Sequence, residues 1–145
     1  GGFHGSWATW ETVASLRLSA TRMRALGTPL GAGVLLSLGA DDCPVELTRR
    51  VVAYLAGQSA GRCGPCFNGL PALATAVEAV SRGVGGTARV EELSRLVVRR
   101  GACAHPDGTV RLVRSLLSTF AAEVAAHASA ACRWNRFDDA ERGVA

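Results

Sequence analysis

Apolar residues recur at helical spacing along most of the chain after residue 43. Glycine- and proline-rich turns interrupt this pattern, so it predicts four helices, over about 43–55, 66–81, 90–100 and 109–127. The short connections between them favour antiparallel neighbours. We therefore expect a mainly α fold in which the helices form a four-helix bundle.

The N-terminal part of the chain has a different pattern. Leu16–Leu26 is predicted to form a short helix, and Gly31–Leu38 reads as one buried strand with glycines that allow close packing. We expect a short β-containing segment over residues 1–42, a helical domain over 43–128 and a polar tail over 129–145. Since the chain starts with Gly-Gly rather than Met, we also expect that it continues a longer polypeptide.

Charge and composition narrow the possible functions. The net charge is +4, but every basic residue is an arginine and these alternate with Asp and Glu, so we expect no nucleic-acid partner. No run approaches the ~18 apolar residues that span a bilayer, which predicts a protein peripheral to a membrane at most. With five cysteines, an odd number, and no secretory signal, the sequence favours reduced thiols and a cytoplasmic location.

Three cysteines lie in the predicted turns of the bundle. Cys63 and Cys66 form a Cys-x-x-Cys that leads into a helix, where backbone amides and the helix dipole stabilise thiolates. Cys103 lies in the turn one helical hairpin further on, which an antiparallel bundle brings to the same end. The spacing alone allows an iron–sulfur site, a zinc site that lacks one ligand, or structural thiols. A redox dithiol of the thioredoxin kind would need a βαβ context, which this stretch lacks.

The residues around this pair carry a family resemblance. Ser59, Gly61, Cys63, Pro65, Cys66 and Gly69 match, in register, the motif Ser-Cys-Gly-x-Cys-x-Pro-Cys-Arg-x-Gly. That motif is typical of the NADH-binding subunit of respiratory complex I and of its hydrogenase and formate dehydrogenase relatives. Later matches are Cys103-Ala104, which resembles the turn with the fourth ligand, and Phe120 with Glu123, which resembles a Phe-x-x-Glu pattern. The glycines near residues 1–5 and 31–34 resemble the end of the β-grasp (SLBB-like) domain that precedes this region.

The resemblance implies a [4Fe-4S] cluster held by Cys63, Cys66 and Cys103. The first cysteine of the family motif is Ala60 here and its arginine is Phe67, so one ligand is missing. His105, two residues after Cys103, is a candidate for the fourth position, because histidine replaces cysteine in some clusters. Further candidates are Cys43 and Cys132. A three-iron or solvent-ligated cluster, or no cluster at all, are the other outcomes.

By the same resemblance, the chain is an electron-transfer module of an NADH dehydrogenase-like flavoprotein. In the family, such a cluster takes electrons from reduced flavin and passes them to a neighbouring Fe–S subunit. The family binds FMN and NAD upstream of this region, so the chain has no complete active site and needs flavin or Fe–S subunits as partners. The alternatives are a binding or assembly module that lost the cluster, and a structural domain stabilised by zinc.

Overall fold

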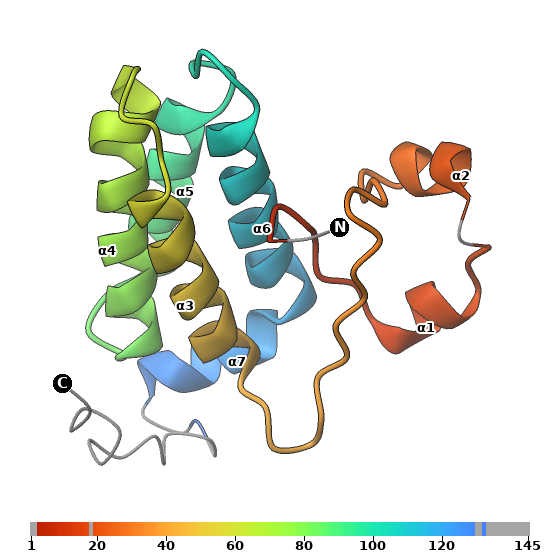
Figure 1. Ribbon diagram of the computed structural model, residues 1–145. Helices are drawn as coiled ribbons and strands as arrows, with labels where there is room; N and C mark the ends of the chain where they lie inside the picture. The colour runs from red at the N-terminus through yellow and green to blue at the C-terminus, as the bar shows by residue number, and fades with distance from the viewer. Residues whose placement is uncertain (1–2, 18, 130–131, 133–145) are drawn as a thin grey trace, which may run out of the picture.

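The computed structural model describes residues 3–17, 19–129 and 132, and it is mainly helical, as predicted. Four helices form the bundle in Figure 1: α3 (Pro44–Gly57), α4 (Leu70–Ser81), α5 (Thr87–Val97) and α6 (His105–Thr119). The helix α7 (Ala121–Ala128) crosses one end of it, and the short helices α1 (Trp10–Ala14) and α2 (Ala20–Ala25) stand to one side.

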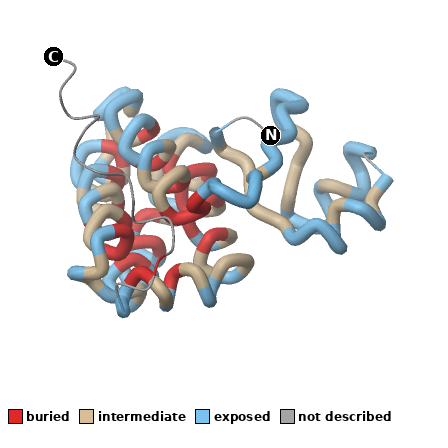
Figure 2. The backbone as a smooth tube through the Cα atoms, turned by 90° about the horizontal axis from the view of Figure 1, so that it is seen from below, coloured by how far each residue is buried: buried red, intermediate tan, exposed pale blue. Residues whose placement is uncertain are grey.

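The bundle is held together by one hydrophobic core. The helices α3 and α5 each pack against both α4 and α6, so the four form a closed ring. Figure 2 shows the buried residues gathered between the helices. The core side chains recur at the predicted three- and four-residue spacing, and the most deeply buried are Val45, Val52, Leu70, Leu73, Val77, Val90, Val97, Val110, Val113 and Leu116.

The last predicted helix differs from the structure at both ends. It was expected over 109–127, but α6 begins at His105, because Pro106 suits the first helical turn and Asp107 is favourable near the helix N-terminus. It ends at Thr119, because the backbone of the next residue, Phe120, leaves the helical region at φ −117° and ψ 38°. The chain then turns into α7, which carries His127.

The strand predicted over Gly31–Leu38 is wrong. No strand occurs in the residues that the structure describes, and Val34, Leu35 and Leu36 are all more than half exposed. A strand is stable only when a neighbouring strand shares its hydrogen-bond ladder, and no strand lies beside this one in the described ranges. The β-grasp assignment of residues 1–42 therefore stays a prediction.

Before residue 43, the helical residues are placed differently from the prediction. The helix expected over Leu16–Leu26 forms only at α2, and α1 was not expected. The hydroxyls of Thr9 and Ser19 accept backbone hydrogen bonds at the two helix starts. The predicted tail over 129–145 lies outside the described residues, except for Ser129 and Cys132. Within the part of the chain that is described, no helix is both long and apolar enough to cross a bilayer.

The chain before α1 packs onto the bundle through Trp7. The indole Nε1 donates to Thr48 Oγ1 of α3 at 2.9 Å, and the Trp7 backbone N–H donates to Ser115 Oγ of α6, also at 2.9 Å. The ring lies edge-to-face against Phe120, with centroids 5.7 Å apart. Trp7 thus joins α3 to α6 at the edge of the core.

Replacing this side chain should destabilise the domain. We expect Trp7→Ala to lower the free energy of unfolding by about 3 kcal/mol, because it removes a large packed ring together with its contacts to Thr48 and Phe120. Trp10, which is 77% exposed, provides the matched control, and Trp10→Ala should change stability by less than about 0.5 kcal/mol. Urea unfolding of both variants measures this, and equal losses would contradict the packing role of Trp7.

Candidate functional site

The two cysteine-bearing turns meet at one end of the bundle. A short π-helix, η1 (Pro65–Gly69), runs directly into α4 and carries Cys66, while Cys103 lies two residues before α6. Figure 1 shows both turns at the same end, opposite α7. The thiols of Cys63 and Cys103 both help to raise the pKa of Cys66, which indicates that the two turns bring these thiols near one another. Because α4 and α6 both begin here, two positive helix ends face the thiols.

The residues of the Ser59–Gly69 motif have identifiable structural roles. The Ser59 hydroxyl donates to the Cys66 carbonyl at 3.3 Å and ties the two ends of the turn together. Gly61 adopts φ +63°, a left-handed conformation that favours glycine. At Gly69, a Cβ atom would come within 2.5 Å of Val97 Cγ2, so the absence of a side chain lets η1 approach α5 closely.

The two cysteines of this turn have opposite protonation tendencies. Backbone hydrogen bonds from Ala102 and Cys66, helped by the Cys66 thiol, lower the pKa of Cys63. Burial, followed by the neighbouring thiols of Cys63 and Cys103, raises the pKa of Cys66. Backbone amides therefore point at sulfur in this turn, as they do where thiolates bind metal centres. The contribution of Ala102 comes from its main chain, so no residue type could have indicated it.

These residues offer three thiols, one fewer than the four cysteines that a [4Fe-4S] cluster usually takes. Cys66 is buried, Cys63 is half-buried and Cys103 is exposed, so the site is open to solvent on one side. Ala60 offers no ligand. Cys63, Cys66 and Cys103 are not among the ligand groups that the described residues bring within 4.8 Å of one another. As they stand, these three thiols are therefore not arranged around a single ion.

The His105 side chain already makes a hydrogen bond and a ring contact. Its Nε2 lies 2.9 Å from the carbonyl oxygen of Leu55, which makes Nε2 the protonated nitrogen and the hydrogen-bond donor. The ring also packs edge-to-face on His4, with centroids 4.9 Å apart. Ligation through Nε2 would break this bond. The role predicted for His105 as a ligand stays a prediction.

Cys43 and Cys132 are wrong as candidates for the fourth ligand. Cys43 caps the start of α3, and this helix of 14 residues is about 20 Å long, so it separates Cys43 from the cysteine turns. Cys132 lies beside Cys43, together with His127 of α7. Burial, with a smaller contribution from Cys132, raises the pKa of Cys43 to about 11. Neither thiol can reach the other end of the bundle without unfolding it.

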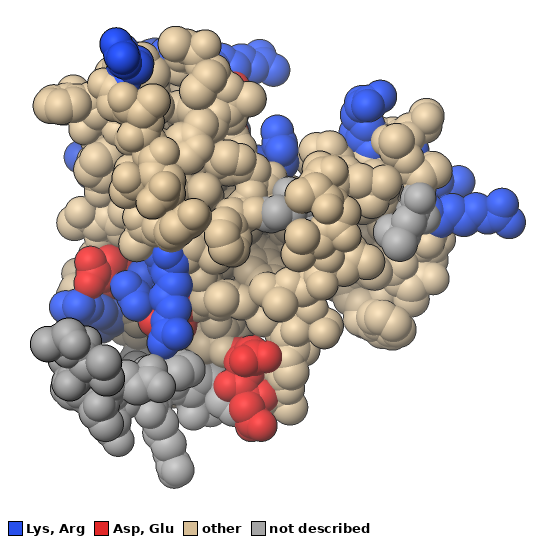
Figure 3. All heavy atoms as spheres, viewed as in Figure 1, with Lys and Arg blue, Asp and Glu red and all other residues tan. Residues whose placement is uncertain are grey.

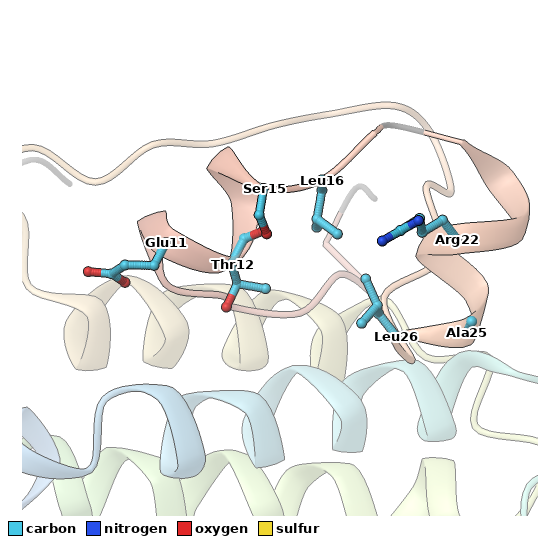
Figure 4. A pocket seen from close by; sticks show the side chains of 7 residues that line it. All are labelled: Glu11, Thr12, Ser15, Leu16, Arg22, Ala25 and Leu26. Carbon is cyan, nitrogen blue, oxygen red and sulfur yellow. The ribbon is translucent and has the colours of Figure 1, made fainter.

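One surface hollow lies away from all of these residues. It is formed between α1 and α2, and Figure 4 shows Arg22 extending toward Leu16 and Leu26 while Glu11 lies apart. No cysteine or histidine lines it. On the face shown in Figure 3, arginines are scattered rather than gathered, and Arg49, Arg50, Arg82 and Arg89 pair with glutamates.

The fold and the site together define a small helical domain with a thiolate site for a soft metal centre. Residues 46–127 match the family described as the NADH-ubiquinone oxidoreductase-F iron-sulfur binding region. The chain belongs to this family. It is therefore the iron–sulfur-binding, electron-transfer region of an NADH dehydrogenase-like subunit.

Curated relatives agree with this assignment. An NADH-quinone oxidoreductase F subunit of Rhizobium meliloti is 30% identical over 72% of this chain and 26% of its own length. Its Escherichia coli counterpart is 31% identical, over 67% of this chain and 23% of the relative. The HndC component of an NADP-reducing hydrogenase from Solidesulfovibrio fructosivorans is 26% identical, over 68% and 21%. The chain spans about a quarter of the length of these relatives.

Because η1 approaches α5 closely at Gly69, adding a single methyl group there should destabilise the domain. Gly69→Ala should lower the free energy of unfolding by about 1–3 kcal/mol, because its Cβ would overlap Val97. Gly57, the last residue of α3, is the control, since a Cβ there meets nothing within 4 Å. Thermal unfolding of both variants tests this, and an unchanged stability of Gly69→Ala would refute the close packing of Gly69 against Val97.

The opposite pKa shifts predict an order of thiol reactivity. In protein freed of metal and kept reduced, Cys63 should be alkylated faster than Cys66 near pH 8, because more of it is thiolate and it is less buried. Peptide mapping after timed iodoacetamide treatment measures both rates. Raising the pH should increase the alkylation rate of Cys66 more than that of Cys63. The reverse order would show that the amide hydrogen bonds to Cys63 do not form in solution.

Proposed function

We propose that Cys63, Cys66 and Cys103 hold a [4Fe-4S] cluster and that the chain is a one-electron carrier of an NADH dehydrogenase-like flavoprotein. The observation that supports this best is the convergence of three thiols with sulfur-directed amides at one end of the bundle. Bound there, the cluster takes up and releases single electrons. The protein contributes thiolates, amide hydrogen bonds and helix N-termini, which favour negative charge at the sulfurs.

The fourth iron position is best assigned to solvent or a small ligand. Ala60 carries no donor atom, and the Nε2 of His105 is hydrogen-bonded to Leu55. Cys103 is exposed and Cys63 is only half-buried, so water has access to this side of the site. A cluster held by these three cysteines would leave one iron without a protein ligand, and that iron would be the first to be lost.

The electron path extends beyond this chain. Relatives named as NADH-quinone oxidoreductase and hydrogenase subunits support partners within an oxidoreductase complex. We infer that FMN and NAD bind to an upstream part of the full protein, and that a neighbouring Fe–S subunit accepts the electron. Reduced thiols in a cytoplasmic setting suit both the cluster and this role.

Anaerobic reconstitution tests the proposal directly. The full chain is produced with iron and sulfide, and iron, acid-labile sulfide and visible absorbance are measured. We expect three to four irons per chain and a broad absorbance that dithionite bleaches. Cys66→Ser should abolish both, while the matched control Cys132→Ser, at the far end, should leave them unchanged. Equal spectra for the native chain and Cys66→Ser would remove Cys66 from the site and contradict the proposal.

Restoring the family residue at position 60 gives a second test. Ala60→Cys should raise the iron content to four per chain and slow the loss of absorbance in air, because all four irons then have a thiolate. Electron paramagnetic resonance after brief oxidation should show a three-iron signal in the native chain and less of it in Ala60→Cys. Identical decay in both proteins would mean that Ala60 does not stand at the fourth position.

The substitution at Ala60 also favours one alternative, a binding or assembly module that kept the fold without the cluster. Such a protein would stay colourless and iron-free after reconstitution and would keep its thermal stability without metal. Zinc held by Cys63, Cys66 and Cys103, in place of iron, would instead indicate a zinc-stabilised structural domain. Metal analysis of the same reconstituted samples separates these outcomes.

A further inference from the structure

Three metal-ligating side chains meet at the end of the bundle opposite the cysteine turns. Cys43 Sγ lies 3.2 Å from His127 Nε2, and the ligand atoms of Cys43, His127 and Cys132 are all within 4.8 Å of one another. All three side chains are at least 94% buried. Elsewhere in the described ranges, no other three ligands of this kind come so close.

The histidine is oriented as a metal ligand requires. The other ring nitrogen, Nδ1, donates to the Ser81 carbonyl at the end of α4, which leaves the lone pair of Nε2 directed at the thiols. Such a hydrogen bond to a carbonyl is the usual support of a metal-bound histidine. The backbone is held closely as well, because a Cβ at Gly83, whose φ is +70°, would overlap the His127 carbonyl oxygen.

Cys43 is placed to bind as a thiolate. It is the N-cap of α3, and the Glu46 N–H donates to its Sγ at 3.4 Å. A divalent ion with two thiolates and a neutral imidazole has no net charge, so the complete site can be buried at low cost.

We propose that Cys43, His127 and Cys132 bind one zinc ion that joins the start of α3 to α7 and the chain after it. Binding replaces one proton on each thiol, releases two protons to solvent and changes no oxidation state. Two sulfurs and one imidazole nitrogen at single-ion spacing are ligands that zinc prefers, and water completes the tetrahedron. This site does not depend on the proposed cluster, which uses none of these residues.

Metal analysis of the full chain tests the site. The protein, purified without chelators and with zinc supplied, should hold one zinc per chain in addition to any iron. X-ray absorption at the zinc edge should show two sulfur neighbours at about 2.3 Å and a nitrogen at about 2.0 Å. Three or four sulfur neighbours without nitrogen would place the zinc at the other cysteines and overturn the proposal.

Matched variants at the two ends sharpen the result. Cys132→Ala should lower the zinc retained after dialysis against a weak chelator about tenfold or more, while Cys66→Ala should retain it. Iron and acid-labile sulfide, measured on the same samples, should be lost in Cys66→Ala and kept in Cys132→Ala. A chain that never takes up iron but loses zinc only in Cys132→Ala would refute the cluster and support the zinc site.

A measurement on the native chain covers the case in which Cys132→Ala does not fold. Cys43 and Cys132 should resist alkylation while zinc is bound and become reactive together when a strong chelator removes it. Peptide mapping of the labelled cysteines reports this. Equal labelling before and after chelation, no bound zinc, or a Cys43–Cys132 disulfide in freshly purified protein would each overturn the proposal.

Discussion

The direction of the four packed helices is the constraint on which the rest of this structure depends. Since α3, α4, α5 and α6 alternate in direction around one core, α4 and α6 must both begin at the same end. That arrangement brings Cys66 and Cys103 together although they lie on different turns, and it adds two helix N-termini to their surroundings. The core thus fixes the chemistry of the turns without contributing a ligand to them.

The other end of the bundle has a different chemistry for the same geometrical reason. There α3 begins and α4 ends, so a capping thiol and a free carbonyl group stand near each other. The break at Phe120 turns α7 across this end and delivers His127 between them. One end of the domain therefore presents partly exposed thiols, while the other encloses its thiols almost completely. These opposite exposures suit electron exchange at the first end and a structural role at the second.

The bundle helices and the cysteine turn could be predicted from the sequence, because each depends on residues that are close together in the chain. Helical spacing of apolar residues located the bundle helices, and the Cys-x-x-Cys with its glycines and proline located the turn. The strand at Gly31–Leu38 was wrong, since a strand depends on a neighbour that the local pattern cannot reveal. The group of Cys43, His127 and Cys132 was missed because Cys43 and His127 are 84 residues apart. A cysteine directly before Pro44 at a helix start was the one available signal.

The packing of Trp7 bears on how the domain can be shortened. A fragment that starts at Cys43 keeps every helix of the bundle and all five cysteines, and by those measures it looks complete. It would nevertheless lack the indole that links Thr48 to α6, and it would expose the apolar surface beside Phe120. The smallest version of this domain that keeps its packing intact must therefore include the residues around Trp7, far ahead of the first bundle helix.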